Sequence, residues 1–194
     1  MSLKTGRINS KLRGMCFVSI FTAVIAALAQ VSVPMPGGVP FTLQTFAVLL
    51  SGVILGAKKG ALAAVIYVLL GAAGIPVFTG FQGGFGVIAR HTGGFILSFP
   101  LMALCAGAGA DLQNRFTNIR LKNAVLAAWL VFGSAINLTC GMLWGKSVMD
   151  LSLRSAFMIF FMPFILTSVI QIVSAAALGT AVKKILAKTG MLVI

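Results

Sequence analysis

The chain has 194 residues, of which 59% are hydrophobic and only 9% are charged, and its mean hydropathy is +1.08. A soluble domain carries about 25% charged residues, so the expected solvent of this chain is lipid. Fifteen Lys and Arg residues against two Asp residues give a net charge of +13. Because the basic residues lie between long apolar segments, we expect anionic lipid headgroups as their partners, and no nucleic acid.

Six apolar segments approach or reach the roughly 20 residues that a helix needs to cross a bilayer. They are Met15–Val33, Phe41–Ala57, Gly60–Ala73, Thr92–Ala110, Lys122–Gly145 and Ser155–Ala187. The last is longer than one membrane thickness, so we expect it to include a lead-in segment. The third is short, and the Gly-Ile-Pro sequence at 74–76 is expected to end it. The sequence therefore predicts an all-α integral membrane protein with six transmembrane helices.

The basic residues predict the orientation of these spans. Three of them fall on one side of the membrane when the spans alternate: Arg90, Lys146 and Arg154. The other twelve fall on the opposite side: Lys4, Arg7, Lys11, Arg13, Lys58, Lys59, Arg115, Arg120, Lys122, Lys183, Lys184 and Lys188. Since cytoplasmic loops carry the excess of Lys and Arg, both termini are expected in the cytoplasm. Residues 1–194 are expected to form one domain in the plasma membrane, with 1–13 as a basic cytoplasmic tail.

Side chains able to catalyse a reaction are scarce. His91 is the one histidine, and neither Asp111 nor Asp150 lies well inside a span. A membrane protease would need a Ser beside a His, or several zinc ligands. The sequence also lacks a GxxxxGK[ST] phosphate-binding loop. We therefore expect no enzymatic activity, no metal and no cofactor, and we expect another protein to supply the energy for any uphill transport.

Small residues recur at four-residue spacing on the first helix, at Ser19, Ala23 and Ala27. Such a stripe lets two helices approach closely in lipid. The helix that packs against this stripe could belong to the same chain or to a partner protein, and the spacing alone leaves both interpretations open.

Two loop segments are candidate binding loops. PMPGGVPFTLQ at 34–44 is expected to form a stiff turn that leads Thr42 and Gln44 into the second helix. GFQGGFGVIARHTGGF at 80–95 is rich in glycine, which lets backbone amides approach a ligand closely. Four polar side chains lie in the second segment: Gln82, Arg90, His91 and Thr92. The alternative is that both are plain extracellular loops, with Arg90 at the membrane interface.

Several longer motifs occur together: VPFTLQTFAVLLSGVILG at 39–56, GALAAVIYVLLGAAGIPVF at 60–78, GGFGV and TGGF within 83–95, GMLW at 141–144, and FFMP at 160–163. In this combination they resemble the BioY family, the biotin-specific substrate-capture components of energy-coupling-factor (ECF) vitamin importers. The resemblance covers about residues 17–187.

The resemblance implies a six-helix bundle that binds its vitamin at the outer face, beneath the loops after the first and third helices. It also implies that Ala23 and Ala27 dock on a transmembrane coupling protein driven by two ATP-binding-cassette ATPase subunits. That role would account for the lack of an energy-converting residue in this chain.

One departure from the family pattern affects the expected site. Many members carry Gly-Asp-x-x-Lys after the proline of the last helix, where this chain has Phe164, Ile165 and Ser168 after Pro163. The ureido ring of biotin needs hydrogen-bond donors and acceptors, and its carboxylate needs a cation or several N–H groups.

The predicted ligand-binding residues are therefore Gln44, Gln82, Arg90, Thr92, Gly93, Ser168 and Gln171, with Thr167 as a further candidate. Arg90 is the predicted partner of the carboxylate and Lys146 is the alternative. Tyr67 and Trp144 are candidate apolar walls, and the alternative for each is an anchor at the membrane interface. The alternative functions are capture of another vitamin or a biotin precursor by the same scaffold, and a membrane interaction subunit that transports no solute.

Overall fold

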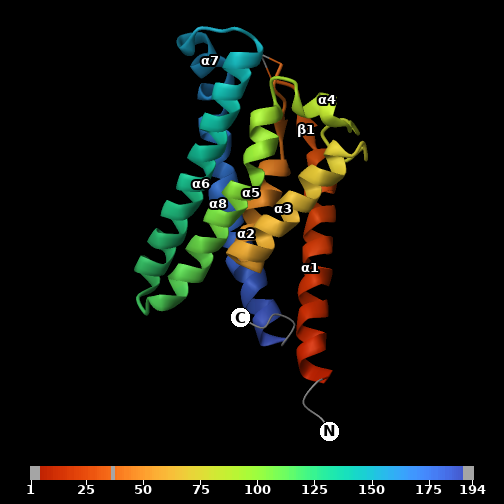
Figure 1. Cartoon of the computed structure of the whole chain (residues 1–194). Coiled ribbons are helices and arrows are strands. Elements are labelled where there is room, and N and C mark those ends of the chain that lie inside the picture. Colours follow the sequence, from red (N-terminus) through yellow and green to blue (C-terminus); the bar gives the residue numbers. More distant parts are fainter. Residues whose placement is uncertain (1–4, 36–37, 190–194) are drawn as a thin grey trace.

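The computed structural model describes residues 5–35 and 38–189 of the chain. Lys4, Pro36 and Gly37, which enter the predictions above, lie outside these residues. The described chain is a bundle of helices with one short two-stranded ribbon (Figure 1). In chain order the elements are α1 (Thr5–Ala29), β1 (Ser32–Val33), β2 (Phe41–Thr42), α2 (Gln44–Leu55), α3 (Ala57–Ala72), α4 (Phe85–Ile88), α5 (Gly93–Leu112), the 3₁₀ turn η1 (Gln113–Arg115), α6 (Ile119–Val148), α7 (Leu153–Phe160) and α8 (Met162–Lys188).

Four helical segments of the described chain are long and apolar enough to cross a membrane: Lys11–Ala29, Gly93–Arg115, Ile119–Val148 and Leu153–Lys188. These four segments correspond to the first, fourth, fifth and sixth predicted spans. α2 lies within the second predicted span, and α3 overlaps the third. However, α2 has 12 residues and α3 has 16. At about 1.5 Å per residue they are shorter than the roughly 30 Å hydrocarbon core. The mostly helical membrane fold is confirmed, whereas the count of six crossings stays a prediction.

Two predicted helix ends are wrong, because a β-ribbon occupies them. The first helix ends at Ala29 rather than Val33, and the second begins at Gln44 rather than Phe41. Ser32 pairs with Thr42 and Val33 with Phe41 in antiparallel register. Pro34 disfavours helical backbone at the residue before it, so the chain leaves the helix early and pairs with the segment that returns from the turn.

The predicted end of the third helix and the predicted loop that follows it are both confirmed. α3 ends at Ala72, and Gly74 takes a positive φ of 100° that favours glycine. The glycine-rich segment that follows forms turns, a bridge between Phe78 and Gln82, and the single helical turn α4. α7 is the expected lead-in to the last helix; it stops at a break at Phe161, and a proline stands in the first turn of α8.

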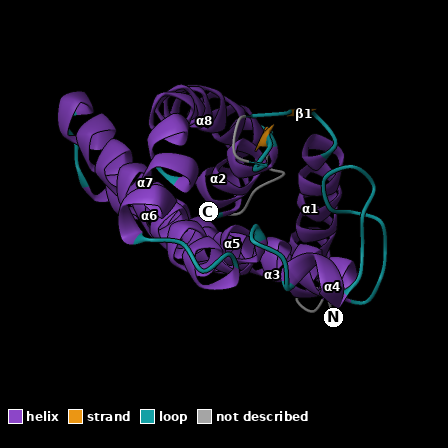
Figure 2. Ribbon diagram, turned by 90° about the horizontal axis from the view of Figure 1, so that it is seen from above, coloured by secondary structure: helices purple, strands orange, loops and turns teal. Residues whose placement is uncertain are grey.

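Viewed from above, α2 and α5 lie in the middle of the bundle, between α6 and α8 on one side and α1 and α3 on the other (Figure 2). Glycine makes this arrangement possible. A Cβ atom at Gly52 of α2 would lie 2.8 Å from the Ala106 Cβ of α5 and 2.9 Å from the Gly107 nitrogen. The two backbones therefore touch almost directly, as small residues permit in lipid.

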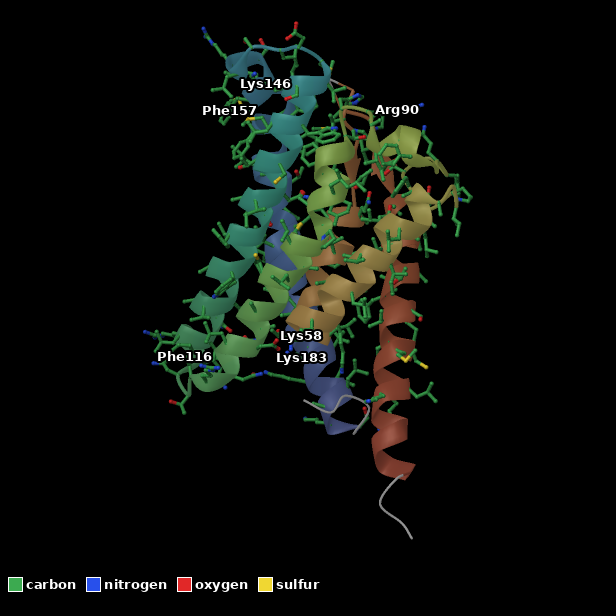
Figure 3. The ribbon with its side chains drawn as sticks, viewed as in Figure 1. Lys58, Arg90, Phe116, Lys146, Phe157 and Lys183 are labelled. Carbon is green, nitrogen blue, oxygen red and sulfur yellow. The ribbon has the colours of Figure 1, made fainter. Side chains whose placement is uncertain are left out.

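The two ends of the bundle differ in charge. The ribbon, α4 and α7 lie at one end, which we call the ribbon end, and α1 begins and α8 ends at the opposite, terminal end (Figure 1). Arg90 and Lys146 lie at the ribbon end, whereas Lys58 and Lys183 lie toward the terminal end (Figure 3). This distribution agrees with the predicted grouping of basic residues; which end faces the cytoplasm stays a prediction.

Asp111 joins three helices toward the terminal end. This residue lies in the last turn of α5. Its Oδ2 accepts a hydrogen bond from the backbone N–H of Ala57, the first residue of α3, at 3.1 Å. A carboxylate at a helix N-terminus is favoured by the helix dipole. Its Oδ1 lies 3.7 Å from Nζ of Lys183 on α8. One of the two acidic residues of the chain is thus used to hold the bundle together.

Candidate functional site

A cavity of about 380 Å³ lies at the ribbon end, among the two predicted binding loops and helices α2, α5, α6 and α8. This volume is in the range of small-molecule sites. Its apolar lining includes five phenylalanines: Phe41, Phe78, Phe95, Phe99 and Phe164. The arrangement suits a small molecule with a hydrophobic body and a few polar groups.

Six of the seven predicted ligand-binding residues line this cavity: Gln44, Gln82, Arg90, Thr92, Ser168 and Gln171. Thr42 and Thr167 line it as well. The tertiary structure thus brings both loops and the last helix to one place. Their contact with a ligand stays a prediction.

Gly93 is placed differently. It is the buried first residue of α5 and is not among the residues that line the cavity. A Cβ atom there would collide with the backbone carbonyl of Ile88 in α4. The glycine allows α4 to pack against the start of α5, a contact that the motif could not reveal.

Arg90 is the one Lys or Arg among the described residues that line the cavity. Its Nη1 donates a hydrogen bond to Oε1 of Gln82 at 3.1 Å, and its backbone carbonyl accepts one from Nε1 of Trp144 at 2.9 Å. Lys146, the alternative carboxylate partner, does not line the cavity. An anionic ligand in the cavity would therefore find its positive charge at Arg90.

His91 connects the two candidate binding loops. Its Nε2 lies 3.2 Å from the backbone carbonyl oxygen of Gly38. Because a carbonyl oxygen can only accept a hydrogen bond, Nε2 carries the proton in this contact. The loop between β1 and β2 is thereby tied to the segment that precedes α5, and both contribute to the cavity wall.

Of the two interpretations given for Tyr67 and Trp144, the role of apolar wall is not supported, because neither residue lines the cavity. Tyr67 is fully buried behind it, where its hydroxyl donates to the carbonyl of Val77 at 3.1 Å and accepts from Nε2 of Gln44 at 2.8 Å. Trp144 holds the backbone of Arg90, as described above. Both aromatic residues therefore position groups that do line the cavity.

Asn137 is a cavity residue that the sequence analysis missed. It lies on α6, is 2% exposed and faces the cavity together with Phe95 and Gln171. A polar carboxamide within a membrane-spanning apolar segment is costly unless it is bonded, and such residues often mark functional sites. That signal was present in the sequence of the fifth predicted span.

The small-residue stripe lies on the surface of the bundle. Ser19, Ala23 and Ala27 are all exposed on α1. Packing of this stripe within the chain, one of the two interpretations above, is therefore excluded.

Among the described residues, no group of three or more His, Cys, Asp or Glu side chains is placed to hold a metal ion.

The sequence model of the BioY family matches residues 3–188 of the chain. The chain belongs to the BioY family. The match includes most of the segment 1–13 that was predicted as a tail, and α1 begins at Thr5 within it.

The curated relatives are similar over nearly their whole length. The chain is 37% identical over 179 residues to "Biotin transporter BioY" of Thermotoga maritima, which covers 90% of this chain and 98% of the relative. It is 34% identical to "Probable biotin transporter BioY" of Pyrococcus horikoshii, over 87% of this chain and 95% of the relative. It is 32% identical to "Biotin transporter BioY2" of Lactococcus lactis, over 93% and 96%.

A solved structure has the same fold. The S-component for biotin from an ECF-type ABC transporter matches with a TM-score of 0.81 at 21% identity, over 91% of this chain and 93% of that one. The chain is a multi-pass integral membrane protein. The names of the relatives are those of transporters, in agreement with the prediction of a binding protein rather than an enzyme.

Proposed function

We propose that this chain captures biotin at the outer face of the plasma membrane, as the substrate-binding subunit of an ECF-type importer. The observation that carries the proposal is the cavity at the ribbon end, which gathers Gln44, Arg90 and Gln171 from three distant parts of the chain. Three relatives that match nearly the whole chain are named as biotin transporters or probable biotin transporters. No cofactor enters the proposal, because biotin is the cargo.

The cavity offers complementary groups to each part of biotin. The phenylalanines provide an apolar surface for the bicyclic ring and the aliphatic chain. Arg90 provides a charge-assisted hydrogen bond for the carboxylate. The buried carboxamides of Gln44 and Gln171 provide polar groups for the ureido ring. The charged pair that many family members carry on the last helix has no counterpart at Ile165 and Ser168.

Binding of tritiated biotin to the purified protein in detergent tests the proposal directly. We expect saturable binding that unlabelled biotin displaces. Dethiobiotin, a biotin precursor that lacks the sulfur, forms the second arm of the experiment. Displacement by dethiobiotin at much lower concentration than by biotin would favour the precursor as the natural ligand. The absence of binding by either would contradict the proposal.

The exposed stripe on α1 is the proposed contact with the ECF transmembrane coupling protein, which carries the two ATPase subunits. Ala23 and Ala27 present little more than backbone to a partner helix. Small residues of this kind give close helix–helix packing in membranes. The stripe lies on α1 outside the residues that line the cavity, so ligand and partner would use different surfaces.

The topology that we propose has six crossings and both termini in the cytoplasm, with the ribbon end outside. α2 and α3 meet at Gly56 without any intervening loop, and Lys58 and Lys59 follow this turn as exposed side chains. Lysine side chains can extend to the interface from a helix end that lies within the membrane, which lets two short helices complete a crossing pair.

Single cysteines in a version without native cysteine test this topology. We expect cysteines near Lys59 and near Asn118 to resist a membrane-impermeant thiol reagent in intact cells, and cysteines near Phe81 and near Met149 to react. Labelling at position 59 in intact cells would overturn the six-crossing arrangement.

A further inference from the structure

Three carboxamide side chains on the helical wall of the cavity are almost completely buried. Oε1 of Gln44 on α2 lies 3.5 Å from the Thr79 hydroxyl, whereas the other two, Asn137 and Gln171, bond to described residues through their nitrogens alone. Asn137 of α6 is 2% exposed and Gln171 of α8 is 5% exposed, and both line the cavity. A carboxamide has an N–H₂ group that donates and a carbonyl oxygen that accepts, so its orientation decides what it offers to a ligand. The neighbours of these two side chains determine that orientation.

Asn137 has its nitrogen turned toward α5. Nδ2 lies 2.9 Å from the backbone carbonyl oxygen of Phe95 and 2.8 Å from Oγ of Ser98. The Ser98 hydroxyl has one proton, which it donates to the carbonyl of Gly94 at 2.8 Å or of Phe95 at 3.0 Å. Both atoms near Asn137 must therefore accept, so only the nitrogen end can face them. The Oδ1 oxygen is left on the side of the cavity.

Gln171 has the same polarity. Its Nε2 donates to the backbone carbonyl oxygen of Thr42 at 2.9 Å. That carbonyl cannot donate, so the amide cannot be reversed without losing the bond. Again the carbonyl oxygen, Oε1, is left for the cavity. No described residue donates a hydrogen bond to Oδ1 of Asn137 or to Oε1 of Gln171.

No charged group accompanies these oxygens on the helical wall. The described residues that line the cavity include no Asp or Glu, and Arg90 lies on the loop before α5 with its guanidinium bonded to Gln82. The cavity therefore has a cationic group on its loop side, and its helical side includes two neutral amide oxygens that accept no hydrogen bond from a described residue. An acceptor that is buried and oriented in advance is complementary to a neutral N–H donor.

We propose that Asn137 Oδ1 and Gln171 Oε1 receive hydrogen bonds from two N–H groups of the ligand, so that the site selects a neutral head group with two donors. The inference rests on the proposed function, in which that head group is the cyclic urea of biotin. It assigns the recognition of this head group to two neutral amides, in a chain that has Ile165 and Ser168 where many family members carry a charged pair.

Two biotins that each carry a methyl group on one ureido nitrogen provide the test. Their binding to the purified full chain is measured by competition with tritiated biotin. For the wild-type protein we expect each methylated compound to bind roughly tenfold more weakly than biotin, because one N–H donor is lost and one buried acceptor stays unpaired. Equal affinity of all three compounds for the wild-type protein would overturn the inference.

Variants then assign each donor to its acceptor. Asn137→Leu and Gln171→Met keep the side-chain size and remove the oxygen. Each is expected to weaken biotin by roughly tenfold, yet to bind one of the two methylated compounds about as well as it binds biotin. Gln113→Met is the matched control, because Gln113 is a buried glutamine that does not line the cavity. It should keep the full discrimination.

Equal loss of affinity for all three compounds in Asn137→Leu and Gln171→Met would show that these residues are structural, and would overturn the inference. If Asn137→Leu does not fold, as judged by thermal unfolding, Gln171→Met and the wild-type comparison still decide the question. Failure of the wild-type protein to bind biotin is a separate outcome, which overturns the proposed function and the inference with it.

Discussion

The cavity and the exposed small-residue stripe of α1 suit two different kinds of contact, one with a small ligand and one with another helix. Around the cavity, polar side chains are held by bonds to other parts of the chain: Gln44 by Tyr67, Asn137 by Ser98, and Gln171 by Thr42. On α1, Ala23 and Ala27 are small and exposed, and they offer shape without polar groups. A small polar ligand needs donors and acceptors that are oriented before it arrives. A helix that docks in lipid needs a surface it can approach closely.

Because the cavity and the α1 stripe are separate surfaces, we expect that mutations can separate ligand capture from docking on the coupling protein. Changes at the cavity should alter affinity for the ligand in the isolated protein. Changes on α1 should alter transport while affinity is kept. The four predictions that follow test this separation, from the largest expected effect to the smallest.

Arg90→Gln should have the largest effect. The carboxylate of biotin would lose its charge-assisted hydrogen bond, which contributes about 1.5–3 kcal/mol, so the Kd for biotin should rise roughly ten- to a hundredfold. Competition with tritiated biotin measures this. Biotinamide, whose carboxylate is capped as a neutral amide, should lose much less affinity.

Lys146→Gln is the matched control for Arg90→Gln, since Lys146 lies at the same end of the bundle but does not line the cavity (Figure 3). We expect little change in its Kd for biotin. If Arg90→Gln weakens the acid and the amide equally, Arg90 acts only through its contacts with Gln82 and Trp144, and the carboxylate must be bound elsewhere.

Ala23→Trp or Ala27→Trp should reduce uptake of biotin by about tenfold or more in cells that contain the coupling protein and ATPases, because a large side chain prevents close helix packing. Biotin binding by the purified variant should be nearly unchanged. Val173→Trp is the control, because Val173 is 62% exposed on α8, away from the stripe. Equal loss of uptake and binding in the α1 variants would mean that the stripe also supports the binding site.

Tyr67→Phe should have an intermediate effect on stability and affinity together. Without the hydroxyl, the Val77 carbonyl and the Gln44 amide both lose a partner in the bundle interior. An unsatisfied buried polar group costs about 1–3 kcal/mol. Thermal unfolding in detergent should show a lower melting temperature, and the Kd for biotin should rise several-fold. An unchanged Kd would argue that Gln44 needs no orienting partner.

Asp111→Asn should have the smallest effect and should spare binding. The substitution removes a negative charge from the N-terminus of α3 and from beside Lys183. A charge at a helix terminus contributes about 0.3–1 kcal/mol at an exposed position. We expect a small decrease in melting temperature with the Kd for biotin unchanged. A large change in Kd would contradict the separation between the cavity and the terminal end.

The sequence was sufficient to predict most of the helices and the two loop segments that line the cavity. Long apolar segments in lipid must satisfy their own backbone hydrogen bonds, so they predict helices wherever they occur. Glycine and proline end such helices by local backbone constraints, which is why the ends at Gly74 and the turns of the glycine-rich segment were predicted correctly. The two candidate binding loops were predicted as loops for the same local reason, and residues of both line the cavity.

The tertiary structure decided what depends on residues far apart in the chain. The ribbon that shortens α1 and α2 forms only when Val33 meets Phe41. The exposure of Ala23 and Ala27 depends on which helices surround α1, and four-residue spacing is compatible with either answer. The polarity of the cavity depends on hydrogen bonds that join residues 39 and 129 positions apart, from Asn137 to Ser98 and from Gln171 to Thr42. Composition and periodicity determine which residues enter the membrane, whereas the direction in which a carboxamide points is determined by its neighbours in space.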